Sequence, residues 1–173
     1  MTFSIPNLDL TGTGYCASFN FRRASRAITA LYDSALQESG IRSTQFAILT
    51  AVAKLQPVSI GTISVILITD ATTLTRSLDL LRQQGLLTIS PRSKMRQRFL
   101  NLTLEGEKAL SRALPLWREI QQKFEKQVGG SDNWNTLRAQ LESLAKLAVS
   151  MEQKETKSKP LSQEERSANA VEP

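Results

Sequence analysis

The sequence has no histidine and only one cysteine, Cys16, among its 173 residues. A single cysteine cannot form an internal disulfide, and without histidine the common metal sites and nucleophile–base pairs of enzymes are missing. The chain also lacks a glycine-rich phosphate loop, and its carboxylates are scattered without an evident cluster. We therefore expect a protein that is not an enzyme and that needs no cofactor.

Long apolar runs are absent as well. None approaches the roughly 20 residues of a membrane-spanning helix, and the first residues, MTFSIPNLDLTGTG, lack the basic start and apolar stretch of a secretory signal. We expect a cytoplasmic protein that does not associate with membranes. Because 40% of the residues are hydrophobic, the chain can still form an apolar core.

Positive charge is concentrated in one part of the chain. The net charge is +6, and residues 70–98 contain six cationic but only two acidic side chains. Residues 152–173, in contrast, contain four cationic and five acidic ones. A concentrated basic segment attracts polyanions, of which nucleic acid is the commonest, but a solvated basic face without a partner has the same composition.

Apolar residues recur at helical spacing in the first third of the chain. Residues 1–14 contain Pro6, Gly12 and Gly14 and are expected to form a flexible arm. Residues 15–40 are expected to form one long helix. Its apolar face comprises Phe21, Ala24, Ile28, Leu31 and Ala35. A second helix is expected to begin at Ser43 or Thr44, with an inward stripe of Phe46, Leu49 and Ala53.

Two capped helices then follow in close succession. Ser59 is expected to cap a short helix, and Asp70 caps the next one, DATTLTRSLDLLRQQG, which ends at Gly85. In this second helix Leu74, Leu78 and Leu81 form the buried stripe. The opposite face carries Thr72, Thr73, Thr75, Arg76, Asp79 and Gln83.

The spacing of apolar residues is no longer helical after Gly85. Residues 86–90 and 99–103 predict two short strands, and the loop PRSKMRQR between them makes a basic β-hairpin. Its cationic residues are Arg92, Lys94, Arg96 and Arg98. A hairpin is narrow enough to reach a minor groove of DNA, where the negative potential attracts arginine.

Residues 104–152 predict two helices that are separated by Gly129 and Gly130. The second helix has apolar residues at alternating steps of three and four, which is typical of a helix–helix interface. They are Trp134, Leu137, Leu141, Leu144, Ala148 and Met151. Residues 153–173 are charged and poor in large apolar side chains, so we expect a disordered tail.

Together these elements predict a mainly α fold with a small β-hairpin wing. A helix, a tight turn, a capped helix and a basic hairpin in this order form a winged helix-turn-helix, here expected over residues 41–103. Arginine can donate two hydrogen bonds to guanine and threonine can contact thymine or phosphate, so the exposed helix face suits a major groove.

The chain resembles the MarR family of winged helix-turn-helix regulators. The resemblance rests on TQFAIL at 44–49, DATTLTRSLDLLRQQGLLT at 70–88 and LTLEG at 102–106, and it extends from about Cys16 to Met151. It implies that the flanking segments, residues 15–40 and 104–152, form the helical dimerisation region of a homodimer, which represses transcription at a pseudo-palindromic site on double-stranded DNA until a ligand or an oxidant relieves the repression. It also implies that Thr72, Thr73 and Arg76 contact the major groove.

By the same resemblance, Arg96 at the wing tip would enter the minor groove. The family wing often carries Asp-Arg-Arg before the returning strand, whereas this chain has Lys94-Met95-Arg96 and lacks the aspartate. The resemblance further implies that a small aromatic or phenolic effector binds between the dimerisation helices and the DNA-binding lobe. The alternative function is a winged helix that binds another protein and has lost DNA recognition, but the basic wing argues against it.

Several residues have two interpretations. Cys16 lies at an expected helix start, where the positive helix end favours a thiolate, and it resembles the reactive cysteine of peroxide-sensing family members. We favour the simpler interpretation of a small buried residue. Trp117 and Trp134 either line an effector pocket or, as we prefer, anchor the core or an interface. Arg22, Arg23 and Arg26 either pair with a partner subunit or are solvated.

Overall fold

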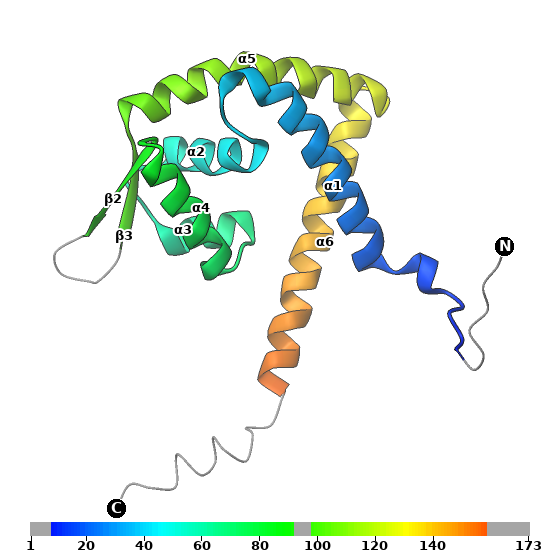
Figure 1. The fold of residues 1–173 in the computed structure, drawn as a ribbon. Coiled ribbons are helices and arrows are strands. Elements are labelled where there is room, and N and C mark those ends of the chain that lie inside the picture. The colour runs from blue at the N-terminus through cyan, green and yellow to red at the C-terminus, as the bar shows by residue number, and fades with distance from the viewer. Residues whose placement is uncertain (1–7, 92–97, 159–173) are drawn as a thin grey trace, which may run out of the picture. The chain divides into compact units, whose positions relative to one another are not determined.

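A computed structural model of the chain describes residues 8–91 and 98–158. Most of these residues are helical, and three short strands form one sheet (Figure 1). In chain order the elements are η1 Thr13–Tyr15, α1 Ala17–Leu36, η2 Gln37–Ser39, α2 Ser43–Leu55, β1 Val58–Ser59, α3 Ile60–Leu67, α4 Ala71–Gln83, β2 Leu87–Pro91, β3 Arg98–Leu102, α5 Leu104–Gln127 and α6 Ser131–Ser158. This arrangement confirms the predicted fold class.

The chain divides into two compact units, with the boundary between Gln121 and Gln122 inside α5. The first unit holds α1 to β3 and most of α5, and the second holds the end of α5 and α6. Across the described ranges, no helix is both long and apolar enough to cross a membrane.

The core of the first unit is built from one face of each element. The predicted stripe of α4 is confirmed, because Leu74, Leu78 and Leu81 are all buried. The prediction for α2 is partly wrong: Phe46 and Leu49 are buried, but the third position is Val52, and Ala53 is exposed. Because the apolar face of α2 is wide, either Val52 or Ala53 could have pointed inward. The packing of α2 against its neighbours buries Val52.

The sheet has one strand more than the sequence predicted. β2 and β3 form the expected antiparallel hairpin, and β1 pairs with the other edge of β3 to give the order β1-β3-β2. β1 consists only of Val58 and Ser59, which is too short to show a period of two. The Gln56 side chain reinforces this edge by accepting a hydrogen bond from the Leu102 amide at 2.7 Å.

Side-chain caps fix the two helices before the hairpin. The Ser59 hydroxyl accepts from the Thr62 amide at 3.0 Å, and the Asp70 carboxylate accepts from the Thr73 amide at 2.9 Å, so both predicted caps are confirmed. Between the helices Ile68 adopts the left-handed conformation, with φ 48°. The turn is closed by the Ser64 hydroxyl, which donates to the Thr69 carbonyl at 2.7 Å.

The second unit consists of the end of α5 and helix α6, joined by a short turn. Gly129 and Gly130 both have positive φ and separate α5 from α6, as predicted. Phe124 and Trp134 pack edge to face with ring centroids 5.5 Å apart. Helix α6 continues to Ser158, past the expected start of the tail at residue 153, and η1 lies partly within the expected arm of residues 1–14.

Gly106 in the first turn of α5 lies directly against the backbone of Leu86, the residue before β2. A Cβ atom at this position would overlap the carbonyl oxygen of Leu86, which is backbone and cannot turn away. We predict that Gly106→Ala lowers the free energy of unfolding by about 2 kcal/mol, measured by urea denaturation. Gly61→Ala is the matched control, because a Cβ there meets nothing closer than Ser59 Oγ at 3.8 Å. An equal loss in both variants would contradict this explanation.

A carboxylate on α1 holds the start of α2. Asp33 Oδ1 accepts hydrogen bonds from the Ser43 amide at 2.7 Å and from the Ser43 hydroxyl at 2.6 Å. The Ser43 hydroxyl is the main cause that holds the pKa of the Asp33 carboxyl below its ordinary value. Desolvation opposes it as the second-largest effect, and the Ser43 amide and the Arg42 charge add smaller lowering contributions.

This lowered pKa makes part of the stability depend on pH. Because the folded-state pKa of Asp33 lies below the unfolded one, its contribution is complete above the unfolded value and is lost as the pH falls through about 4 towards the folded value. We predict that Asp33→Asn costs about 1 kcal/mol at pH 7 and that the cost shrinks below pH 4. Urea denaturation across pH checks this, and a cost that is constant with pH would refute it.

Candidate nucleic-acid interface

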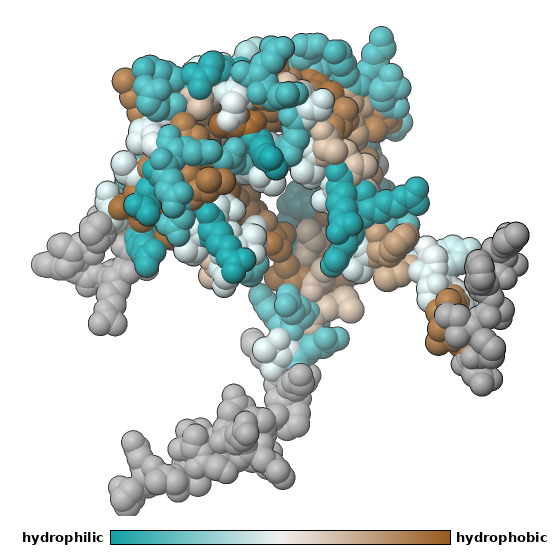
Figure 2. Space-filling model, in the orientation of Figure 1, coloured by the Kyte–Doolittle hydropathy of each residue, from teal (hydrophilic) through white to brown (hydrophobic). Residues whose placement is uncertain are grey.

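Helix α4 presents a polar face to solvent opposite its buried leucines. Thr72, Thr73 and Arg76 are exposed, and Gln83 continues the same side of the helix. Figure 2 shows hydrophilic residues over much of the visible surface around α4. The face is therefore accessible to a macromolecule without any change in the core of the lobe.

The hydroxyl groups on α4 differ in how free they are. Thr75 is half-buried, and its hydroxyl donates to the Ala71 carbonyl at 2.6 Å. Asp70 remains at the first turn as a carboxylate, because the Thr73 hydroxyl and amide hold its pKa below the ordinary value. Of the predicted threonines, Thr72 and Thr73 are the more exposed, but the Thr73 hydroxyl is engaged by Asp70 and the Thr75 hydroxyl by its own helix.

The hairpin lies beside α4 in the same lobe (Figure 1). Arg98 is exposed at the start of β3, where it is paired in register with Pro91 of β2. The other three cationic residues predicted for the wing, Arg92, Lys94 and Arg96, fall outside the described residues. The described part of the site is therefore α4 together with the base of the hairpin.

Two helices leave apolar faces uncovered in the single chain. On α1, Phe21, Ile28 and Leu31 are each more than 40% exposed. On α6 the exposed residues are Leu137, Leu141, Leu144, Leu147 and Met151. Soluble monomers rarely expose apolar stripes of this length, so these faces have the character of an interface.

Cys16 is exposed and reduced, at the N-cap position of α1. The interpretation of Cys16 as a buried residue is therefore wrong for the single chain, because the first turns of α1 extend beyond the core. Tyr32 lies farther along α1, and its hydroxyl donates to Gln121 Oε1 at 2.6 Å.

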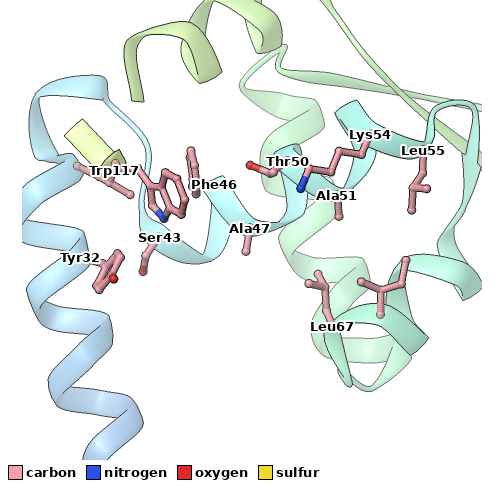
Figure 3. Close-up of a pocket in the computed structure, with 12 residues that line it drawn as sticks. Tyr32, Ser43, Phe46, Ala47, Thr50, Ala51, Lys54, Leu55, Leu67 and Trp117 are labelled. Atoms are coloured by element: carbon pink, nitrogen blue, oxygen red, sulfur yellow. The ribbon is translucent and has the colours of Figure 1, made fainter. Parts of the chain in front are cut away.

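A cavity of about 460 Å³ lies among α1, α2, α3 and α5 of the first unit (Figure 3). Trp117 and Phe46 line it and are stacked, with ring centroids 5.8 Å apart and planes at 23°. Trp117 also packs against the core, so it is both a core residue and a cavity wall. The two interpretations of Trp117 are therefore compatible.

Two polar groups enter this mostly apolar cavity from α2. The Thr50 hydroxyl is buried and has no hydrogen-bond partner within the described part of the chain. Lys54, one turn later, brings an ammonium group to the same side (Figure 3). Sequence reasoning did not single out Thr50 and Lys54, because only the fold brings them to the same cavity as Tyr32 and Trp117.

Solved structures resemble this chain over most of its length. The M. tuberculosis transcriptional regulator MosR, crystallised with DNA, is 32% identical, with a TM-score of 0.68 over 77% of this chain and 98% of the other. A mutant of E. coli MarR in complex with operator DNA is 20% identical, with a TM-score of 0.69 over 79% of this chain and 99% of the other.

A third similar structure is PcaV from Streptomyces coelicolor in complex with its natural ligand. It is 21% identical and has a TM-score of 0.70 over 83% of this chain and 99% of the other. Neither a family model nor a curated protein sequence matches the chain. The similar structures described here are transcriptional regulators, and none is an enzyme.

Proposed function

Because the chain belongs to the MarR family of winged helix-turn-helix transcriptional regulators, we propose that it represses transcription by binding specific double-stranded DNA as a homodimer. The observation that carries this proposal is the orientation of α4. Its leucines are buried while Thr72, Thr73 and Arg76 face solvent beside the hairpin. These side chains have the hydrogen-bonding groups and the charge that a major groove requires.

The wing supplies the second set of contacts in this proposal. Arg98 is exposed at the base of the hairpin, and the sequence adds Arg92, Lys94 and Arg96 towards its tip. We propose that Arg96 enters the minor groove and that the other cations contact phosphates, which position the protein without reading bases. Because this chain lacks the family's aspartate, we propose that Arg96 is held by the negative potential of the minor groove and not by a fixed orientation of its side chain.

Dimerisation is supported by the uncovered faces of α1 and α6. A second copy of the chain would cover both, and Leu137, Leu141 and Leu144 repeat at the spacing of a helix–helix seam. A two-fold dimer presents two copies of α4 and so binds half-sites about one helical turn apart. The operator would then be a pseudo-palindrome.

Selection on random duplexes tests these proposals together. The expected result is enrichment of a pseudo-palindromic sequence with half-sites about 10 base pairs apart. Enrichment of an asymmetric sequence would contradict the dimer, and the absence of any enriched sequence would contradict specific DNA recognition and favour a protein-binding module instead.

Arg76 is proposed to contact bases, so its loss should reduce specificity. We predict that Arg76→Ala lowers the ratio of operator to random-duplex affinity by about tenfold or more, as measured by fluorescence anisotropy. Arg82→Ala is the matched control on the same helix, because Arg82 is also exposed but is paired with Asp79 at 3.6 Å and, six residues after Arg76, projects from a different side of the helix. Equal specificity in Arg76→Ala and the wild type would remove Arg76 from base recognition.

The cavity beside Trp117 is proposed to bind a small aromatic effector. Stacked rings form one wall, the Thr50 hydroxyl is free to hydrogen-bond, and Lys54 can balance a negative charge. An aromatic carboxylate or phenolate combines a flat apolar body with an anionic group, and so matches all three features.

Benzoate is a suitable probe, because Trp117 can report its binding. In a Trp134→Phe background Trp117 is the only tryptophan, and we predict that benzoate changes its fluorescence and weakens DNA binding. Lys54→Met should reduce benzoate affinity by about tenfold, whereas Lys108→Met, a control on α5 whose ammonium pairs with Glu105, should not. Equal benzoate affinity in both variants would exclude Lys54 from the site.

Cys16 is proposed to sense oxidants. It is exposed at the N-terminal end of α1, so an organic hydroperoxide can reach the thiolate and oxidise it to a sulfenic acid while being reduced to an alcohol. The modification would lie on the helix that carries one of the two proposed dimer faces.

This sensing role makes a direct prediction. Cumene hydroperoxide should weaken operator binding by the wild type several-fold and leave Cys16→Ser unchanged, in titrations run side by side. If both proteins lose binding alike, or if neither does, then Cys16 is not the sensor.

A further inference from the structure

Gln45 is a buried polar residue that joins α2 to the recognition helix. Its side chain is only 8% exposed, although it lies at the start of α2. Its Oε1 accepts from the Arg42 amide at 2.9 Å, and its Nε2 donates to Gln84 Oε1 at 2.9 Å. Gln84 is the C-cap residue of α4, so this carboxamide ties the end of α4 to the beginning of α2.

The space beside this bond is largely unfilled. A cavity of about 470 Å³ lies between the start of α2 and the second half of α4, lined by Arg42, Thr44, Ile48, Ser77 and Leu80 in addition to the two glutamines. Apolar packing holds α4 along its leucine stripe, but on this flank the Gln45–Gln84 hydrogen bond spans a gap.

The same segment of α2 is tied to α1. Asp33 accepts two hydrogen bonds from Ser43, which follows Arg42 directly in the chain. The path therefore runs by hydrogen bonds from α1 to Ser43, along one step of covalent backbone to Arg42, and again by hydrogen bonds through Gln45 to the end of α4. In each of these hydrogen bonds the donor and the acceptor are 2.6 to 2.9 Å apart.

We propose that this chain of hydrogen bonds sets the direction of α4 relative to α1, and that Gln45 and Gln84 are positioning residues for DNA recognition. The inference rests on the proposed function, in which α1 contributes to the dimer interface and α4 enters the major groove. The direction of α4 relative to α1 then determines the distance between the two recognition helices, and so the operator spacing that the dimer prefers.

The preference of the dimer for one half-site spacing is a readout that a general loss of folding stability does not change. One added base pair moves a half-site by about 3.4 Å and rotates it by about a tenth of a turn, so only a dimer with fixed helix directions discriminates strongly between spacings. Weaker overall folding, in contrast, lowers the affinity for every spacing by the same factor.

The experiment uses the operator from the selection and two versions of it, with one base pair added or removed between the half-sites. Anisotropy titrations compare the wild type with Gln45→Met and Gln84→Met, while Gln37→Met, at an exposed glutamine of η2, is the matched control. Thermal melts establish that each variant is folded at the assay temperature. Gln84 is exposed, so its variant retains the core even if Gln45→Met is unstable.

We expect the wild type and Gln37→Met to prefer the selected spacing, and both Gln45→Met and Gln84→Met to lose about fivefold of that preference. Gln84→Glu should keep the preference, because its carboxylate still accepts from Gln45 Nε2, although its added negative charge lowers affinity for all three duplexes alike. The salt dependence of Gln45→Met should stay unchanged, since no phosphate contact is lost.

An unchanged spacing preference in the folded methionine variants overturns the inference and leaves the proposed function intact. An equal loss of affinity for all three duplexes also overturns it, because the two glutamines then act only through stability. If the wild type binds no duplex specifically, the proposed function itself fails, and the inference fails with it.

Discussion

Leu74, Leu78 and Leu81 fix the rotation of α4 about its own axis, because the helix is held in the core through these three side chains. Once they are buried, the geometry of an α-helix leaves no freedom about which residues face solvent. Thr72 and Arg76 are exposed as a consequence of leucine burial and not through interactions of their own. The Asp70 cap adds a defined start, so both the rotation and the first residue of the helix are specified.

A second constraint acts where the lobe is attached to the rest of its unit. Helix α1 has little of its length in the core, since Leu36 is its only buried residue among those described. Polar contacts near its C-terminal end therefore matter more than they would in a fully packed helix. Two side chains of α1 make these links. Asp33 accepts from Ser43 at the start of α2, and Tyr32 donates to Gln121 of α5. This arrangement leaves most of α1 available for another surface.

The cavity beside Trp117 lies against these same links. Tyr32 and Ser43 both line it, and each also makes a hydrogen bond that ties α1 to another helix. A molecule in the cavity would meet the residues that join α1 to α2 and α5. The wall of the cavity and the attachment of α1 therefore share the residues Tyr32 and Ser43.

Local patterns in the sequence account for much of the fold. The 3.6-residue period of α4, its cap, the glycine that ends it and the alternation in β3 are each encoded within a few residues, so they could be predicted. β1 could not, because a strand of two residues has no period and exists only through pairing with β3. The choice of Val52 over Ala53 was equally undetermined, because both lie on the wide apolar side of α2.

The sequence by itself thus determined the order of the elements and the chemical character of the α4 face. Both follow from neighbouring residues and from the period of a helix. Only the tertiary structure decided which polar side chains from separate elements meet, Asp33 with Ser43 and Gln45 with Gln84. These contacts depend on how helices pack across the core, and no local pattern carries that information because each partner on its own resembles an ordinary solvated residue.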